Sequence, residues 1–239
     1  MKCLVAIFVF FSGLAAVRAD VISYPEDQSK SGITVLETVL LMSEVETLLR
    51  DEVIGASSGF QWDFHWDKPW LGAGSILTDD EVFKVMLWGG LVRAEKMTVP
   101  ALEAILCHEF GHLLGGTPRQ IFPSLSEPEV EHWSSTEGQS DWWAATVCLP
   151  RLYRARGLTP GEIRDRIVKA GLEFTVFAQF HFEKNSPLPD LQVSALETPE
   201  HTLTLAYPSL QCRLDTFRIG AESAIGMETL KRPRCWFAD

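Results

Sequence analysis

The apolar positions between residues 33 and 53 recur with helical spacing. The apolar residues of this stretch are Val35, Leu36, Val39, Leu40, Met42, Val45, Leu48, Leu49 and Val53. They approximate the period of about 3.6 residues that places side chains on one face of a helix. The pattern therefore predicts an amphipathic helix over 33–53 that packs on the core.

From Phe60 onward the pattern changes to aromatic and β-branched runs. The aromatic segment Trp62–Trp66 is followed by two apolar runs, one around Ile76–Leu77 and one over Val82–Trp88, with Asp79–Asp80 between them. Runs of this composition are typical of short strands, and an acidic turn between two of them indicates a hairpin. A small sheet is expected in this part of the chain.

Helix signals dominate the rest of the chain. Thr98 and Pro100 predict a helix start, and Gly115 ends the pattern. The predicted helices cover 98–114, 135–149, 159–183 and a last stretch from Pro208. The second is expected to stop before Pro150, and the third starts with a capping box. A loop is expected over 117–133. Strands followed by helices predict one α+β domain over 20–239, with a sheet-containing part at about 20–97 and a mainly helical part at about 98–239.

The first nineteen residues have the pattern of a secretory signal peptide. Lys2 precedes an apolar run from Leu4 to Val17, and Ala19 supplies a small residue at the expected cleavage site. The run is shorter than the roughly 18 to 20 apolar residues that a membrane span requires. We therefore expect cleavage after residue 19, a periplasmic or secreted protein, and no stable membrane span afterwards.

Charge and cysteine content narrow the possible partners. The 239 residues include 21 Lys and Arg and 32 Asp and Glu, a net charge of -11; loss of Lys2 and Arg18 with the signal makes it -13. This balance argues against a nucleic-acid or anionic-membrane partner, because both need a basic surface. Cys3 leaves with the signal. The remaining cysteines are Cys107, Cys148, Cys212 and Cys235. They permit three full disulfide pairings, and Cys107 is also a candidate free thiol.

The strongest chemical signal lies inside the helix predicted over 98–114. Residues 108–112 read His-Glu-Phe-Gly-His, an H-E-x-x-H motif. Residues four apart lie one turn apart on the same helix face, so His108 and His112 can both reach one zinc ion. Glu109 is then placed to take a proton from a water molecule at the ion. The sequence predicts two zinc ligands and a general base.

A catalytic zinc ion usually takes a third protein ligand. The metzincin extension of the motif needs a histidine where this chain has Pro118, which excludes that arrangement. Glu137 on the next predicted helix is the expected ligand, and Asp141, one turn further, can accept the N–H of a ligand histidine. The spacing from Ser134 to Glu137 also fits a simple capping box. If Glu137 is not a ligand, His132 is the next candidate.

The two motifs together resemble the signature of the gluzincin zinc peptidases. Residues 207–213, Tyr-Pro-Ser-Leu-Gln-Cys-Arg, are similar to the H-P-x-x-x-x-R segment of the peptidase family that contains the CAAX prenyl proteases and their periplasmic quality-control relatives. Tyr207 stands where that family has histidine. The resemblance covers roughly residues 72–218. It implies a zincin-like fold, in which a small mixed sheet packs on the active-site helix.

The resemblance also implies roles for further residues. Tyr207 and Arg213 are expected near the zinc, where they would help the developing oxyanion, with His201 as an alternative. The strand over Val82–Trp88 is expected at the sheet edge, where an extended polypeptide substrate can add as a further strand. The other histidines have no ligand spacing and are expected at the surface or in the core; they are His65, His132 and His181.

These observations predict an exported, zinc-dependent endopeptidase that acts on a polypeptide substrate. Two alternatives stay open. One is a catalytically inactive zinc-binding module of the cell envelope that serves as a chaperone or inhibitor, although the presence of Glu109 counts against it. The other is a structural envelope protein without a metal, which a metal assay would distinguish.

Overall fold

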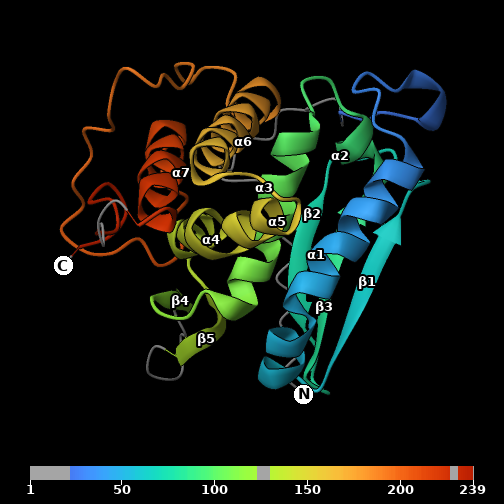
Figure 1. Ribbon diagram of the computed structural model, residues 1–239, viewed down its shortest axis with the longest axis horizontal. Coiled ribbons are helices and arrows are strands. Elements are labelled where there is room, and N and C mark those ends of the chain that lie inside the picture. Colours follow the sequence, from blue (N-terminus) through green and yellow to red (C-terminus); the bar gives the residue numbers. More distant parts are fainter. Residues whose placement is uncertain (1–21, 123–129, 227–230, 239) are drawn as a thin grey trace.

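Helix α3 (Val99–Leu114) lies between a small sheet and the helical half of the molecule (Figure 1). The computed structural model describes residues 22–122, 130–226 and 231–238. The fold is α+β, as the sequence pattern predicts. The predicted signal peptide over 1–19 lies outside the described residues. Among the helices of the described part, none is long and apolar enough to cross a membrane.

The main sheet has three strands, β1 (Gly59–His65), β2 (Ala73–Leu77) and β3 (Val82–Trp88). Their order is β1-β3-β2, with β1 parallel and β2 antiparallel to β3. The antiparallel pair confirms the predicted hairpin. The expectation that Val82–Trp88 forms a sheet edge is wrong, because β1 pairs with its second side and makes β3 the central strand. Strand β2 is an edge instead.

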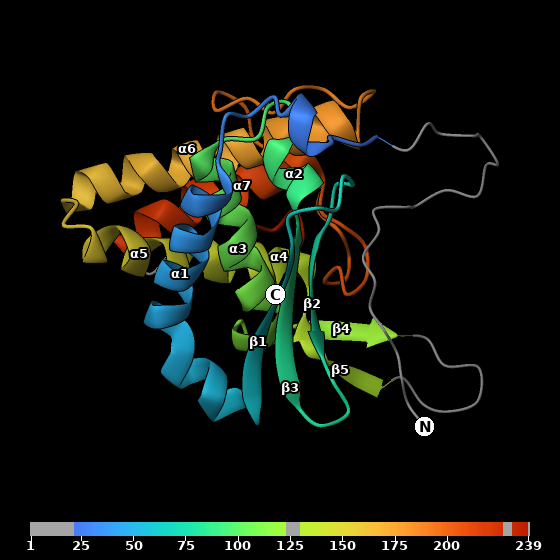
Figure 2. The same cartoon turned by 90° about the vertical axis from the view of Figure 1, so that its right-hand side faces the viewer.

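Helices α1 (Val35–Ala56) and α3 cover the same face of this sheet (Figure 2). A capping box that Thr34 and Glu37 form fixes the start of α1. Phe110, from the middle of the H-E-x-x-H motif, packs on the sheet with its ring centroid 5.4 Å from that of Phe60 and 5.9 Å from that of Phe83. This contact anchors one face of α3 in the core and leaves both motif histidines on another.

Two short helices, the 3-10 helix η1 (Glu26–Gln28) and α2 (Gly89–Arg93), belong to the sheet-containing part. Besides α3, the helical half contains α4 (Glu137–Trp143), the π-helix η2 (Ala144–Cys148), α5 (Leu149–Ala155), α6 (Pro160–His181) and α7 (Leu210–Ala224). Thr159 and Glu162 form the predicted capping box of α6. Ser209 caps α7, so this helix begins two residues after Pro208.

Two predictions for the helical half are wrong. The helix over 135–149 does not stop before Pro150: α4 begins at Glu137, passes into η2 and continues as α5. Pro150 is the second residue of α5 and lies just after the π-helical turn, where the regular bonding of the helix to the fourth residue back is interrupted. The stretch 117–133 is not simply a loop, because β4 (Arg119–Phe122) pairs antiparallel with β5 (Val130–Ser135).

Two disulfides settle the cysteine alternatives. Cys107 pairs with Cys148 and Cys212 pairs with Cys235. The first joins α3, one residue before His108, to the π-helix that follows α4. The second joins the start of α7 to the segment 231–238. Cys107 is therefore not a free thiol.

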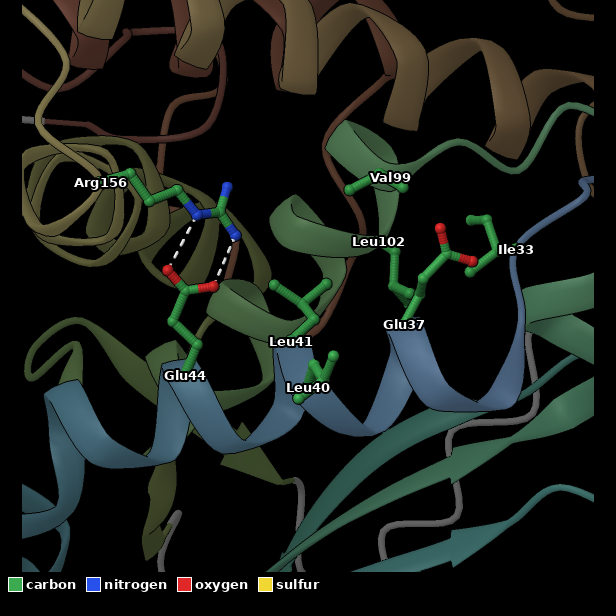
Figure 3. Close-up of a pocket in the computed structure, with 8 residues that line it drawn as sticks. All are labelled: Ile33, Glu37, Leu40, Leu41, Glu44, Val99, Leu102 and Arg156. Atoms are coloured by element: carbon green, nitrogen blue, oxygen red, sulfur yellow. Dashed lines mark hydrogen bonds and ion pairs between the residues drawn. The ribbon is translucent and has the colours of Figure 1, made fainter.

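A pocket between α1 and α3 lies away from the motif residues (Figure 3). Apolar side chains that include Leu41 and Leu102 line it, and Arg156 forms two hydrogen bonds of 2.8 Å with Glu44 at one end. None of its lining residues belongs to the H-E-x-x-H motif or to α4. This pocket is therefore separate from the candidate metal ligands.

Candidate metal centre

Helix α3 presents His108 and His112 side by side, one turn apart. Their ring centroids are 4.7 Å apart, and both residues are buried. On each ring the Nδ1 atom is hydrogen-bonded to neighbouring groups of the protein. The Nε2 atoms of both rings approach the same carboxylate, that of Glu137. Both histidines can therefore offer Nε2 to one shared position.

Helix α4 supplies this carboxylate at its first residue. Thr136 caps α4 by accepting a hydrogen bond from the backbone N–H of Gln139, which fixes where the helix begins. An Oε atom of Glu137 lies 3.2 Å from Nε2 of His108, and the other lies 3.8 Å from Nε2 of His112. The capping role considered for Ser134 belongs to Thr136.

These three residues form a group that can hold a metal ion. One ligand atom from each of His108, His112 and Glu137 lies within 4.8 Å of the other two, and all three residues are buried. Glu137 Oε1 is buried without a hydrogen-bond partner among the described residues. A carboxylate oxygen that is buried and unpaired costs free energy, and a cation between it and the two imidazoles would remove that cost.

The charges of the surrounding groups also fit a divalent cation. Three carboxylates, those of Glu109, Glu137 and Asp141, and one guanidinium, that of Arg213, are buried around the two histidines. With neutral imidazoles, three negative charges and one positive charge leave a net charge of -2. A divalent ion would balance it in a site where uncompensated charge is expensive. Two nitrogen ligands and one oxygen ligand are a donor set that zinc accepts.

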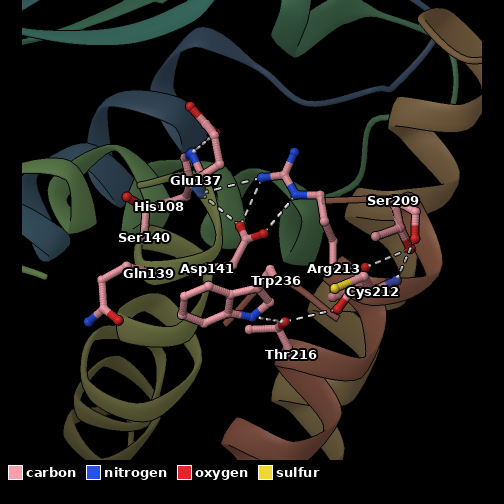
Figure 4. A network of polar contacts seen from close by, with 12 residues as sticks. His108, Glu137, Gln139, Ser140, Asp141, Ser209, Cys212, Arg213, Thr216 and Trp236 are labelled. Carbon is pink, nitrogen blue, oxygen red and sulfur yellow. Dashed lines mark hydrogen bonds and ion pairs between the residues drawn. The ribbon is translucent and has the colours of Figure 1, made fainter. Parts of the chain in front are cut away.

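Asp141 and Arg213 orient His108 from the Nδ1 side of its ring (Figure 4). Asp141 accepts a 2.7 Å hydrogen bond from Nδ1 of His108, so Nε2 of that ring can face a metal. Arg213 binds the same carboxylate through Nε at 2.7 Å and Nη2 at 2.8 Å. Burial alone would raise the pKa of Asp141, but Arg213 and His108 outweigh it and lower this pKa to about 2.

In the metal-free protein the same carboxylates act on His108. Burial alone would lower the pKa of His108, but Asp141 and Glu137 outweigh it and raise this pKa to about 10. The Glu137 carboxyl would have its pKa raised by burial, and the cationic forms of His112 and His108 together with Arg213 lower it instead. Without a metal, the surroundings therefore favour the ionised form of Glu137 and the protonated form of His108.

His112 is oriented by a different set of groups. Its Nδ1 lies 3.0 Å from the backbone oxygen of Ser135 and 3.0 Å from the hydroxyl oxygens of Ser134 and Ser140. The carbonyl can only accept a hydrogen bond, which favours the tautomer with hydrogen on Nδ1 and a free electron pair on Nε2. Sequence reasoning considered Ser134 only as a helix cap and gave Ser135 and Ser140 no role, because contacts of serines with a distant histidine have no sequence signal. β5 and α4 bring them together.

Glu109 lies buried beside the three candidate ligands. Burial raises the pKa of its carboxyl, while His112 and His108 oppose this rise, and Ser75 of the edge strand β2 forms a hydrogen bond with it. A raised pKa brings a carboxylate closer to the range in which it can take up and return a proton near neutral pH. Glu109 is thus a buried carboxyl with a raised pKa beside the candidate ligands.

Tyr207 and Arg213 take different places at the centre. Tyr207 comes from the segment before α7; burial is the main reason that its pKa is raised, with a further rise from Glu137, to which its hydroxyl is hydrogen-bonded. Arg213 is buried in α7 with its guanidinium on Asp141 and 4.4 Å above the Phe174 ring. Tyr207 therefore lies on the ligand side, and Arg213 lies on the supporting side.

The remaining histidines are outside the group of three. His65 contacts Asp63, and His201 is exposed. His181 donates a 2.7 Å hydrogen bond from Nε2 to the backbone oxygen of Glu95. The ring of His132 meets that of Phe122 edge to face in the β4–β5 pair. None of them shares the candidate ligand cluster.

The interpretation of this centre rests on its own geometry. Two imidazoles, one carboxylate ligand, a second buried carboxylate and an orienting Asp–Arg pair converge between α3, α4 and α7. No known protein family matches the chain, and neither a curated protein nor a solved structure shows significant similarity to it. What the site establishes is a buried group of His108, His112 and Glu137 that can bind a metal ion.

Proposed function

We propose that this protein is a zinc-dependent endopeptidase of gluzincin type with a zincin-like fold. The observation that carries the proposal is the buried group of His108, His112 and Glu137 with Glu109 beside it. A purely structural metal site needs no additional buried carboxylate, whereas hydrolysis needs a base. The resemblance to the family of CAAX prenyl proteases and periplasmic quality-control peptidases rests on the same motifs.

His108, His112 and Glu137 would hold the zinc ion. When bound, zinc supplies Lewis acidity that polarises a peptide carbonyl and lowers the pKa of water toward about 7. Glu109 takes a proton from the attacking water and returns it to the leaving amine. The hydroxyl of Tyr207 donates a hydrogen bond to the oxygen on which negative charge develops. Asp141 and Arg213 keep the His108 ring in its ligand orientation.

A polypeptide substrate would lie along β2. This strand is an edge of the three-stranded sheet, and its Ser75 side chain contacts Glu109. An extended peptide that adds to this edge would pass directly beside the base. The proposed place of action is the periplasm or the outside of the cell, and the two disulfides are consistent with an oxidising compartment.

The test is zinc analysis combined with digestion of an unfolded protein, with and without a chelator. We expect one zinc per chain and cleavage that the chelator abolishes. Glu109→Gln should keep the zinc and lose about 10² to 10⁴-fold in turnover, because the amide keeps the shape but not the base. Glu137→Ala should lose the zinc, with Glu52→Ala on the exposed face of α1 as a control.

The possible outcomes separate the alternatives. Zinc binding without cleavage, in parent and variants alike, would favour the inactive chaperone-like or inhibitory module. Absence of zinc uptake by the parent would favour a structural protein without a metal. If Glu137→Ala binds zinc as tightly as the parent, the third ligand lies elsewhere.

A further inference from the structure

The segment 231–238 packs on the first turn of α4, at the residue that follows Glu137. Trp236 is completely buried there. A methyl group added at Gly138 would lie 2.6 Å from Cγ and from Cε3 of Trp236, nearer than carbon atoms approach. The indole ring therefore rests directly on the backbone of Gly138, and only glycine leaves room for it.

We propose that the segment 231–238 is a clasp in which Trp236 is a positioning residue for the metal ligand Glu137. By covering Gly138, the ring would hold the first turn of α4 at the distance from α3 that lets Glu137 meet both histidines. This inference rests on the proposed zinc site, and it adds a residue about 100 positions along the chain from the ligand it positions.

The clasp is fixed to α7 by a disulfide and a hydrogen bond, and a second hydrogen bond within α7 orients the acceptor. The Cys212–Cys235 disulfide attaches the residue before Trp236 to the first turn of α7. The indole Nε1 of Trp236 donates a 3.0 Å hydrogen bond to the hydroxyl of Thr216. That hydroxyl donates in turn to the backbone oxygen of Cys212 at 2.9 Å. The Trp236 ring therefore has a defined position and orientation, as Figure 4 shows.

Helix α7 consequently holds α4 at two points. Arg213, next to Cys212, binds Asp141 in the second turn of α4, and Trp236, bonded to Cys212 through its neighbour, covers Gly138 in the first turn. Asp141 orients one histidine, whereas Gly138 adjoins the carboxylate ligand. The two contacts act on different ligands of the same centre.

Glu137 lies at the very start of a helical run that continues from α4 through η2 into α5. Helix ends fray, and most helical stability in proteins comes from packing, so the position of this first turn depends on what packs against it. A functional group has to be held within about 0.5 Å of its productive geometry, which requires supporting residues that are themselves fixed by packing and hydrogen bonds.

The first test measures the zinc dissociation constant of the full chain by competition with a chelating dye. Trp236→Ala should weaken zinc binding about 10- to 100-fold, the usual effect of losing a group that orients a ligand. Trp236→Phe should restore most of the affinity, because a ring still covers Gly138. The control is Leu49→Ala, a deletion of a completely buried side chain in α1, which should change the affinity by less than about threefold.

The second test is a double-mutant cycle on the same constant. Gly138→Ala should weaken zinc binding in the parent, because the new methyl group displaces the indole ring. In the Trp236→Ala background the same change should have no further effect, since the obstacle is gone. Gly161→Ala is the matched control: Gly161 is also the second residue of its helix, and a methyl group there meets nothing within 4 Å.

A metal-independent measurement separates failure of the clasp from failure of the zinc site. In chelator-treated protein, the backbone amides of residues 140–143 should exchange with solvent faster in Trp236→Ala than in Leu49→Ala. If zinc affinity and amide exchange in Trp236→Ala equal those of the Leu49→Ala control, the clasp is wrong and the zinc site stands. If the parent binds no zinc, the proposed function fails and amide exchange alone decides about the clasp. If Trp236→Ala does not fold, Trp236→Phe takes its place in both tests. The cycle then compares Gly138→Ala in the parent with Gly138→Ala in Trp236→Phe.

Discussion

At the scale of single residues, the hydroxyl of Tyr207 and the guanidinium of Arg213 divide two tasks between them. Arg213 gives its Nε and Nη2 donors to Asp141, so these donors are not directed at a substrate. Tyr207 contacts Glu137 and therefore lies next to the position where a metal-bound carbonyl would sit. We assign the proposed oxyanion role to Tyr207 and a supporting role to Arg213.

Tyr207→Phe should lower turnover about 10² to 10³-fold, the usual cost of removing one oxyanion donor. Zinc content should not change, because the hydroxyl is not among the three ligands and its bond to the substrate strengthens only as charge develops. Steady-state kinetics and elemental analysis of this variant measure both quantities. Turnover within a few-fold of the parent would show that Tyr207 only packs, and would return the oxyanion role to Arg213 or His201.

Asp141 should make the metal-free protein less stable in acid. Its pKa lies at about 2 in the folded chain against an ordinary value of 3.8, so its carboxylate stabilises the fold above about pH 4 and this contribution is lost as the pH falls through 2. His108 stays protonated in both states over this range, since its folded pKa is about 10. The shift corresponds to about 2 kcal/mol.

Denaturant unfolding in chelator at pH 4 and pH 2 can measure this effect. The difference in unfolding free energy between the parent and Asp141→Asn should shrink by about 2 kcal/mol between these two pH values. A difference that stays constant would mean that Asp141 titrates normally in the folded chain.

At the scale of elements, the closest approach at the centre is between α3 and α4. A methyl group at Gly111 would lie 2.8 Å from the backbone oxygen of Ser140 and 2.9 Å from its Cα. Both of these atoms belong to backbone and cannot rotate away. The glycine inside the H-E-x-x-H motif therefore sets the separation of the two helices that carry the candidate ligands.

Gly111→Ala should push α4 away from α3 and weaken zinc binding by at least tenfold, since ligand positions tolerate only about 0.5 Å. Gly55→Ala is the control, because Gly55 also lies in a helix and a methyl group there meets nothing within 4 Å. That control should keep zinc affinity and gain up to about 1 kcal/mol in stability from better helix propensity. Equal zinc affinity in the two variants would contradict the close-packing argument.

The local part of this architecture could be predicted from the sequence. Helical spacing, caps and turn residues identified α1, α3, α6 and the β2–β3 hairpin, because these features depend on neighbouring residues. The central position of β3 could not be predicted in this way, because it depends on pairing with β1, which lies more than twenty residues earlier in the chain. The continuation of the helix past Pro150 as α5 also departs from the prediction, because a proline is normally a sign of a helix end, and the π-helical form of 144–148 has no sequence signal.

The candidate site shows the same division. The residues His108, His112, Glu137 and Asp141 follow from helix periodicity, which puts residues four apart on one face. The serines around His112 and the ring of Trp236 were missed, because their roles arise only when β5 and the C-terminal segment pack against α4. Tyr207 was found through resemblance to a motif rather than through spacing.

At the scale of the whole molecule, the two disulfides should make a large contribution to stability. They close loops with sequence separations of 41 and 23 residues. Each is expected to stabilise the fold by about 3 to 4 kcal/mol, mainly by restricting the unfolded chain. Unfolding in denaturant with and without a thiol reductant measures the sum, and the double variants Cys107→Ser with Cys148→Ser and Cys212→Ser with Cys235→Ser measure each part.

The zinc affinities of the two double variants distinguish the two bridges. Loss of the Cys212–Cys235 bridge should reduce zinc affinity in addition to stability, because it frees the segment that carries Trp236. A stability loss below about 1 kcal/mol for either pair would contradict the entropic argument.

The position of Trp236 also has a consequence for the order of events during synthesis. A ribosome completes the H-E-x-x-H helix long before it reaches residue 236, so the emerging chain contains the histidines while the support of Glu137 is still missing. Cys212 likewise waits for Cys235 before the bridge can form. If the centre depends on this support, the nascent chain carries an incomplete site. The proposed proteolytic activity would then begin only after the chain has been made through residue 236 and this segment has folded onto α4.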